Sequence, residues 1–207
     1  MPLRSLISVV APPLCMSCGA SAGRVEPLCA PCRAGLRWLP PDPAPYGWAP
    51  LAYEGGARAL VRALKFRGAV GLAATMAAQI AATAPSELLD GFTLVPVPIH
   101  PARLRRRGYN QAEWLALEVG ERRGCPVSVC LERVGSSASQ VGRSRLERME
   151  AIEHNVRMRP GFVAPERVVI VDDVITTGAT IDACAGVLFE AGAELVGGLA
   201  YARTLGR

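Results

Sequence analysis

Two adjacent acids stand near the C-terminal end of the chain, between an apolar run and a group of small hydroxyl residues. Asp172 and Asp173 follow the β-branched segment 168–171, and residues 176–180 read Thr-Thr-Gly-Ala-Thr. A turn of this composition at the start of a helix presents backbone N–H groups and hydroxyls to one point, which favours a phosphate. Carboxylates would repel that phosphate, so we expect the two acids to face sugar hydroxyls. Together these residues predict a cradle for a ribose 5-phosphate.

The alternative for the same segment is an acid pair that caps a helix beside an ordinary turn. Other nucleotide sites have motifs that can be checked directly. The chain has no G-x-x-x-x-G-K-[ST] loop and no G-x-G-x-x-G after a strand. P-loop ATPases and enzymes with the usual dinucleotide fingerprint are therefore not favoured.

A second group with chemical potential is an arginine-rich segment after a predicted strand at 93–97. Pro96 and Pro98 are expected to end that strand and to release a loop at the same sheet edge as Asp172. Arginine binds phosphate oxygens in pairs, and a glycine in the loop would allow close backbone approach to a diphosphate. A solvated basic surface or a nucleic-acid patch is an equally good interpretation of any single arginine. The polar and glycine residues of this segment are Arg103, Arg105, Arg106, Arg107, Gly108 and Asn110.

Four cysteines near the N-terminus have metal-ligand spacing. Cys15, Cys18, Cys29 and Cys32 form C-x2-C-x10-C-x2-C, and four thiolates complete the tetrahedron that zinc prefers. Two disulfides or a redox C-x-x-C are the alternatives, which are less favoured in the cytoplasm that we expect for this chain. A closed four-sulfur site leaves no position for a substrate, so its expected role is structural or in docking.

The chain resembles a known family in these same motifs. VVIVDDVITTGAT is similar to the signature of type I phosphoribosyltransferases, and with the four-cysteine module and LVPVPIHPARLRRRGYNQAEWLA the whole chain resembles the competence protein F (ComF) family. The resemblance implies binding of phosphoribosyl pyrophosphate with Mg²⁺. It also implies that Asp172 and Asp173 hold the ribose hydroxyls, and that the pyrophosphate lies beside Arg105, Arg106 and Arg107. The 5-phosphate would be held by Thr176, Thr177, Gly178, Ala179 and Thr180.

The same resemblance implies a mobile flap over the substrate, from Arg133 to Val156. Its polar residues include Gln140, Arg143, Arg145 and Arg148, and the flap with the loops beside it would select an acceptor that the motifs do not identify. Lys65 could reach the site from a helix end, although an exposed, solubilising charge is the preferred interpretation. His100 and His154 are assigned no role as ligand or general base.

The elements that must position these groups alternate between helix and strand. Residues 1–50 predict a turn-rich cysteine module with a Pro-rich link, and residues 51–207 a phosphoribosyltransferase-like α/β domain with a mostly parallel sheet. We expect strands at 93–97, 127–131, 168–171 and 194–199, helices at 57–64, 69–82, 111–123 and 179–191, and a short helix at 146–156 within the flap.

Composition limits the class of protein. Half of the 207 residues are apolar and 20% are charged, as in a soluble globular chain, and no apolar run is long enough to span a membrane. Residues 101–160 hold 12 arginines against 7 glutamates, which accounts for the whole net charge of +5. Two functions therefore stay open. The first is transfer of a phosphoribosyl group, linked through the family to DNA uptake, and the second is a non-catalytic scaffold that associates with nucleic acid or with DNA-processing proteins.

Overall fold

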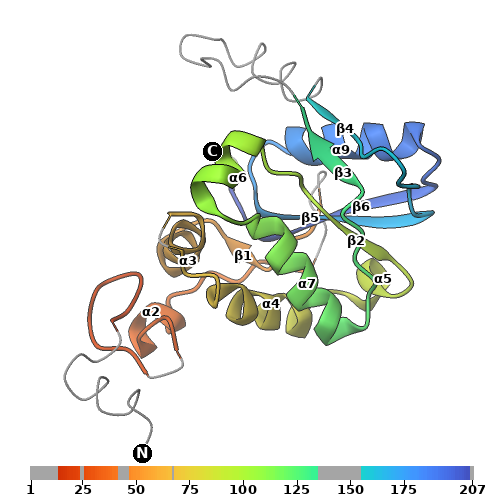
Figure 1. Cartoon of the computed structure of the whole chain (residues 1–207). Coiled ribbons are helices and arrows are strands. Elements are labelled where there is room, and N and C mark those ends of the chain that lie inside the picture. Colours follow the sequence, from red (N-terminus) through yellow and green to blue (C-terminus); the bar gives the residue numbers. More distant parts are fainter. Residues whose placement is uncertain (1–13, 24–25, 42–46, 67, 135–154, 206–207) are drawn as a thin grey trace, which may run out of the picture.

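The computed structural model describes residues 14–23, 26–41, 47–66, 68–134 and 155–205 (Figure 1). Its centre is a four-stranded sheet in which every neighbouring pair is parallel, as the alternation of helices and strands predicts. From one edge to the other the strands are β1 (Leu51–Ala52), β6 (Leu195–Arg203), β5 (Arg167–Ile175) and β2 (Thr93–Pro96). Pro96 is tolerated because β2 lies at the edge of the sheet.

Helices cover both faces of this sheet, as Figure 1 shows. One face carries α3 (Gly55–Phe66), α4 (Leu72–Thr83) and α7 (Gln111–Arg123). The other face carries α9 (Ala179–Glu190), which also packs against an antiparallel pair formed by β3 (Leu131–Arg133) and β4 (Val156–Met158). The short helices are α2 (Ala30–Ala34), α5 (Ser86–Leu89) and α6 (Pro101–Arg107).

The side chains of β5 alternate between two hydrophobic cores. Val169 and Val171 pack with the residues of α3, α4 and α7, whereas Val168 and Ile170 pack with those of α9. Successive side chains of a strand point to opposite faces, so the two acids that follow must also diverge. Asp172 continues the α9 side of the strand and Asp173 the α3 side.

Three sequence predictions of local structure are wrong. The acids do not follow the end of a strand at Val171, because β5 continues to Ile175 and pairs there with Arg203 of β6. The predicted strand 127–131 is only a bridge from Val127 to Leu94, and β3 begins at Leu131. Val156, the last residue of the predicted flap helix, begins β4 instead.

The arginine-rich segment also differs from the prediction, since Arg103, Arg105, Arg106 and Arg107 lie in helix α6 and not in a loop. The helix begins with Pro101 behind a cap by His100, whose Nδ1 accepts a hydrogen bond from the Ala102 N–H at 3.1 Å. It ends at Gly108, where φ is +84°. Glycine is favoured at this left-handed helix end because it carries no Cβ.

None of the helices within the described ranges has the length and apolar character needed to span a bilayer. The proposed flap residues Gln140, Arg143, Arg145 and Arg148 lie outside those ranges, and so does His154.

Candidate functional site

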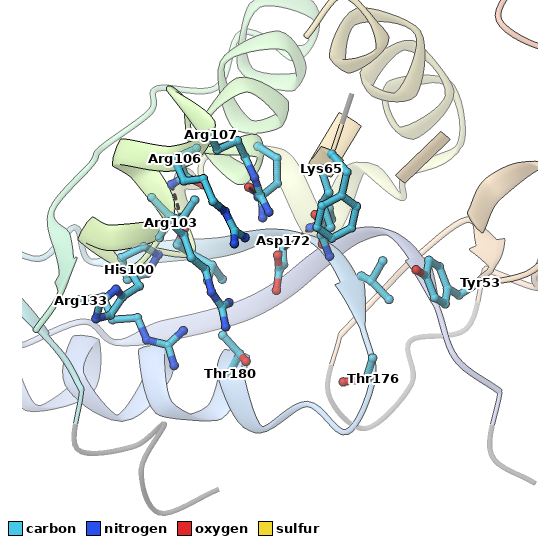
Figure 2. A pocket seen from close by; sticks show the side chains of 18 residues that line it. Tyr53, Lys65, His100, Arg103, Arg106, Arg107, Arg133, Asp172, Thr176 and Thr180 are labelled. Carbon is cyan, nitrogen blue, oxygen red and sulfur yellow. Dashed lines mark hydrogen bonds and ion pairs between the residues drawn. The ribbon is translucent and has the colours of Figure 1, made fainter. Parts of the chain in front are cut away.

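A cavity of about 490 Å³ opens at the carboxyl end of β5, beyond the point where β2 stops (Figure 2). β2 ends opposite Val171, while β5 continues beside β6, so the missing neighbour leaves space next to the two acids. Six helices and strands contribute to the walls, together with several of the segments that connect them. The polar residues that line it are Tyr53, Lys65, His100, Arg103, Arg106, Arg107, Asn110, Gln111, Arg133, Asp172, Asp173, Thr176 and Thr180.

The hydroxyl-rich turn lies at one end of this cavity. Thr176 and Thr180 line the cavity, and Thr177, Gly178 and Ala179 form the turn between them. Gly178 has φ +85° and is the N-cap of α9, so the N–H groups of the first helical turn lie beside the two threonines. The first of them, from Ala179, donates to Thr177 Oγ1 at 3.5 Å. Thr204 of the neighbouring strand end fixes the turn, because its Oγ1 donates to the Thr176 carbonyl at 3.2 Å. The arrangement is suited to an anion such as a phosphate.

The two acids occupy different environments. Asp172 is partly exposed, and its Oδ1 accepts the backbone N–H of Asp173 at 2.7 Å. Asp173 is only 1% exposed, and its Oδ1 lies 2.7 Å from Nζ of Lys65. Burial, followed by the charge of Asp173, raises the pKa of Asp172 to about 7.

Lys65 is thus not a solubilising surface charge, which corrects the sequence interpretation. It lies in the last turn of α3, its side chain is 25% exposed, and it reaches the acids from above in Figure 2. No local pattern predicts this pair, because Lys65 and Asp173 are 108 positions apart in the sequence. Only packing of α3 against β5 brings them together.

The cationic wall comes mainly from α6. Arg103, Arg106 and Arg107 line the cavity, whereas Arg105 is exposed and does not. Partial burial lowers the pKa of Arg107, and its guanidinium lies 5.6 Å from the centre of the Phe66 ring. Arg133, at the end of β3, adds a positive group from another element (Figure 2).

Asn110 has a structural role at the same cavity. Its Nδ2 donates to the Val97 carbonyl at 3.0 Å, and its Oδ1 accepts the Ala112 N–H at 3.1 Å. The side chain therefore caps α7 and ties this helix to the segment that follows β2. Because Asn110 closely follows α6, these bonds also fix the C-terminal end of α6 relative to the sheet.

The four predicted metal ligands converge at the N-terminal end. The Sγ atoms of Cys15, Cys18, Cys29 and Cys32 all lie within 4.8 Å of one another, and none is in a disulfide. Cys18 and Cys29 are 3.6 Å apart. Ligands on a zinc tetrahedron with Zn–S bonds of 2.3 Å are separated by about 3.8 Å, so the cluster fits a metal ion of this kind. The other cysteines lie elsewhere, with Cys130 and Cys184 buried in the core.

Similarity to curated proteins extends over nearly the whole chain. No family model matches. The chain is 31% identical to the DNA utilization protein YhgH of Salmonella typhi over 202 residues, which cover 93% of this chain and 85% of that protein. It is 34% identical to competence protein ComFC of Streptococcus pneumoniae over 103 residues, and 32% identical to competence protein F of Haemophilus influenzae over 104 residues. The last two matches span 44% and 45% of the relatives' lengths.

Solved structures with a similar fold include the allosteric regulatory enzyme of purine biosynthesis, at 23% identity and a TM-score of 0.39 over 70% of this chain and 26% of that one. A hypoxanthine phosphoribosyltransferase from Staphylococcus aureus has 10% identity and a TM-score of 0.33, over 65% of this chain and 62% of that one. The chain has a parallel sheet flanked by helices and a four-cysteine cluster near its N-terminus.

Proposed function

This chain belongs to the ComF family of competence and DNA utilization proteins, and from that premise we propose that its cavity binds phosphoribosyl pyrophosphate with Mg²⁺ and transfers the phosphoribosyl group to an acceptor. The observation that carries the proposal is the combination of groups in the cavity. A hydroxyl-lined helix start, a partly exposed acid and a group of arginines line this one cavity, and they suit the 5-phosphate, the sugar and the diphosphate of the ligand.

The proposed chemistry is a displacement at the anomeric carbon of the sugar. The acceptor's lone pair forms a bond to this carbon while the bond to the pyrophosphate oxygen breaks, and the leaving group takes the electron pair. Arg103, Arg106 and Arg107 stabilise the negative charge that develops on the pyrophosphate. Asp172 and the turn at 176–180 hold the sugar in position for attack.

Each implied metal has a matching donor set. Mg²⁺ binds through one or two carboxylates and phosphate oxygens, so Asp172 would hold it together with the ligand, where it neutralises diphosphate charge. Zinc at Cys15, Cys18, Cys29 and Cys32 would stabilise the N-terminal module and take no part in transfer.

Calorimetry with phosphoribosyl pyrophosphate and Mg²⁺ tests the binding step. We expect saturable binding to the wild type and at least tenfold weaker binding to Asp172→Asn, because the amide keeps the shape and removes the charge. Release of pyrophosphate in the presence of pooled nucleobases and amines, followed by mass spectrometry, tests turnover and identifies the acceptor. Wild-type protein that binds no phosphoribosyl pyrophosphate at low salt would contradict the proposal.

A second candidate function is direct contact with single-stranded nucleic acid. Two further cavities, of about 580 and 510 Å³, lie beside the first and share Phe66, a ring that is 67% exposed. Among the described residues, neither lining contains an acid, while both contain basic groups and one or two aromatic rings. Exposed rings can stack on the bases of a single strand, and the cations beside them can pair with its phosphates. The charged and aromatic linings are Arg58, Arg62, Lys65, Phe66, Arg106, Arg107 and Tyr109.

A salt series with a fluorescent single strand separates this candidate from the first. If the phosphates lie along α3, Arg58→Ala/Arg62→Ala reduces the slope of log affinity against log salt by about 1.4 and leaves phosphoribosyl pyrophosphate binding unchanged. In the triple variant Arg105→Ala/Arg106→Ala/Arg107→Ala, both kinds of binding should weaken. No retention of the strand at 50 mM salt would contradict direct contact.

A further inference from the structure

The two adjacent acids both line the cavity, but they differ in exposure and in partners. Asp172 has surface in the cavity, whereas Asp173 is 1% exposed. The Oδ2 atom of Asp173 is buried and has no hydrogen-bond partner among the described residues, and its Oδ1 is taken by Lys65. A sugar hydroxyl would therefore meet Asp172 first, and the second acid is free for another purpose.

What Asp173 does contact is the ammonium group of Lys65. This group carries three N–H donors, and within the described part of the chain one of them is accounted for by the 2.7 Å contact to Asp173. The side chain keeps a quarter of its surface exposed and lines both the main cavity and the neighbouring cavity of about 510 Å³. Two donors thus remain for a ligand at the mouth of the site.

The charges around this ammonium favour an anion. α6 contributes Arg103, Arg106 and Arg107 to the same cavity, and β3 contributes Arg133. Asp172 and Asp173 are the acidic side chains in the described lining, and Asp173 is already paired. An anionic group between α6 and α3 would meet cations on two sides.

On the premise of the proposed function, we propose that Lys65 contacts the diphosphate of the ligand and that Asp173 is the positioning residue that holds the ammonium there. Asp173 orients Lys65 through one carboxylate oxygen, which fixes a flexible side chain before the ligand arrives. Removing both partners of a buried ion pair is often neutral for stability, whereas removing one is not. The position of this pair at a cavity is therefore explained better by ligand contact than by stability.

Three variants separate ligand contact from a structural role. Lys65→Met/Asp173→Asn removes the ammonium without leaving a buried charge, Asp173→Asn keeps the ammonium and loses its anchor, and Lys65→Arg keeps a cation. Glu118→Gln/Arg122→Met removes an ion pair of α7 away from the cavity without changing the net charge, and serves as the charge-matched control for the double variant. Melting curves confirm that each variant is folded.

The probes are inorganic pyrophosphate with Mg²⁺ and ribose 5-phosphate, measured by calorimetry on the full chain. We expect the double variant to bind pyrophosphate about 10–100-fold more weakly and ribose 5-phosphate within about twofold of the wild type. Asp173→Asn should weaken pyrophosphate binding by an intermediate factor, and Lys65→Arg should keep most of the wild-type affinity. If the ion pair had only a structural role, its removal would weaken the binding of pyrophosphate and of ribose 5-phosphate to the same extent.

Two outcomes are kept apart by this design. If wild-type protein binds phosphoribosyl pyrophosphate and the double variant binds pyrophosphate as tightly as the wild type, the role of Lys65 is overturned while the proposed function stands. If the wild type binds neither phosphoribosyl pyrophosphate nor either probe, the proposed function fails, and the role of Lys65 fails with it.

Discussion

The cavity at the sheet edge and the cysteine cluster at the N-terminal end differ in what holds their side chains in place. Acids of the cavity are part of a nine-residue strand that pairs with β6, and helix caps fix the surrounding groups. The cysteines lie on short turns and on α2, a five-residue helix with no buried residue. The cavity is therefore preorganised by packing, whereas we expect the cysteine cluster to depend also on a metal held by its sulfurs.

The largest effect is expected from loss of a sulfur ligand. Cys18→Ser/Cys29→Ser should abolish stoichiometric zinc, because binding of a structural zinc supplies about 10 kcal/mol or more of folding free energy. Elemental analysis measures the metal, and trypsin cleavage after Arg33 or Arg37 measures opening of the module. Cys125→Ser, at a half-buried position outside the cluster, is the control that keeps its zinc. Undiminished zinc in the double variant would refute the assignment of these ligands.

A smaller effect is expected from Asp172→Asn, which should raise the thermal stability of the protein although it weakens the binding of phosphoribosyl pyrophosphate. Its pKa of about 7, raised by burial and by Asp173, means that the folded state binds a proton more tightly than the unfolded state. Stability should therefore fall as the pH rises from 4 to 7. Asp172→Asn removes this loss and should raise the Tm by about 5 °C at pH 8, with little change at pH 4. The account would be contradicted if the Tm of the wild type and the Tm of Asp172→Asn rose by the same amount between pH 4 and pH 7.

The boundary between the two regions can be tested at Gly56 of α3. A Cβ atom there would lie 3.0 Å from Cδ1 of Leu28 and 3.1 Å from Cδ2 of Leu36, so the helix meets the cysteine module closely. Gly56→Val should cost about 1–3 kcal/mol of unfolding free energy through overpacking, measured in urea. Gly186→Val in α9 is the matched control, since nothing lies within 4 Å of its added Cβ. Equal costs at both sites would mean that helix propensity alone explains the effect.

The smallest effect is expected at Arg105. Its neighbours Arg106 and Arg107 line the cavity and Arg105 does not, so Arg105→Ala should change phosphoribosyl pyrophosphate affinity less than twofold. Arg106→Ala should weaken it about tenfold, as expected for a charge-assisted contact to phosphate. Calorimetry at constant ionic strength measures both. A larger loss at Arg105 would show that the ligand extends beyond the cavity.

The sequence predicts those features that depend on local signals. The helix at 111–123 and the convergence of the four N-terminal cysteines are confirmed, because capping residues and short spacings are local. The length of β5 was missed, since two acids are poor strand formers and the ladder to β6 keeps them in the strand. Helix α6 had usable signals in Pro101 and Gly108. The contact of Lys65 with Asp173 had none, because it depends on tertiary packing.

The unequal ends of β2 and β5 have a consequence for the size of ligand that fits. β2 stops opposite Val171, and β5 runs four residues further to Ile175. At about 3.3 Å per residue this terrace is about 13 Å long, which is the scale of a pentose with a phosphate at one end. Main-chain length, rather than any one side chain, sets this dimension. Substitutions in residues 172–175 should therefore change which chemical groups of a ligand are recognised. They should have little effect on the length of ligand that fits.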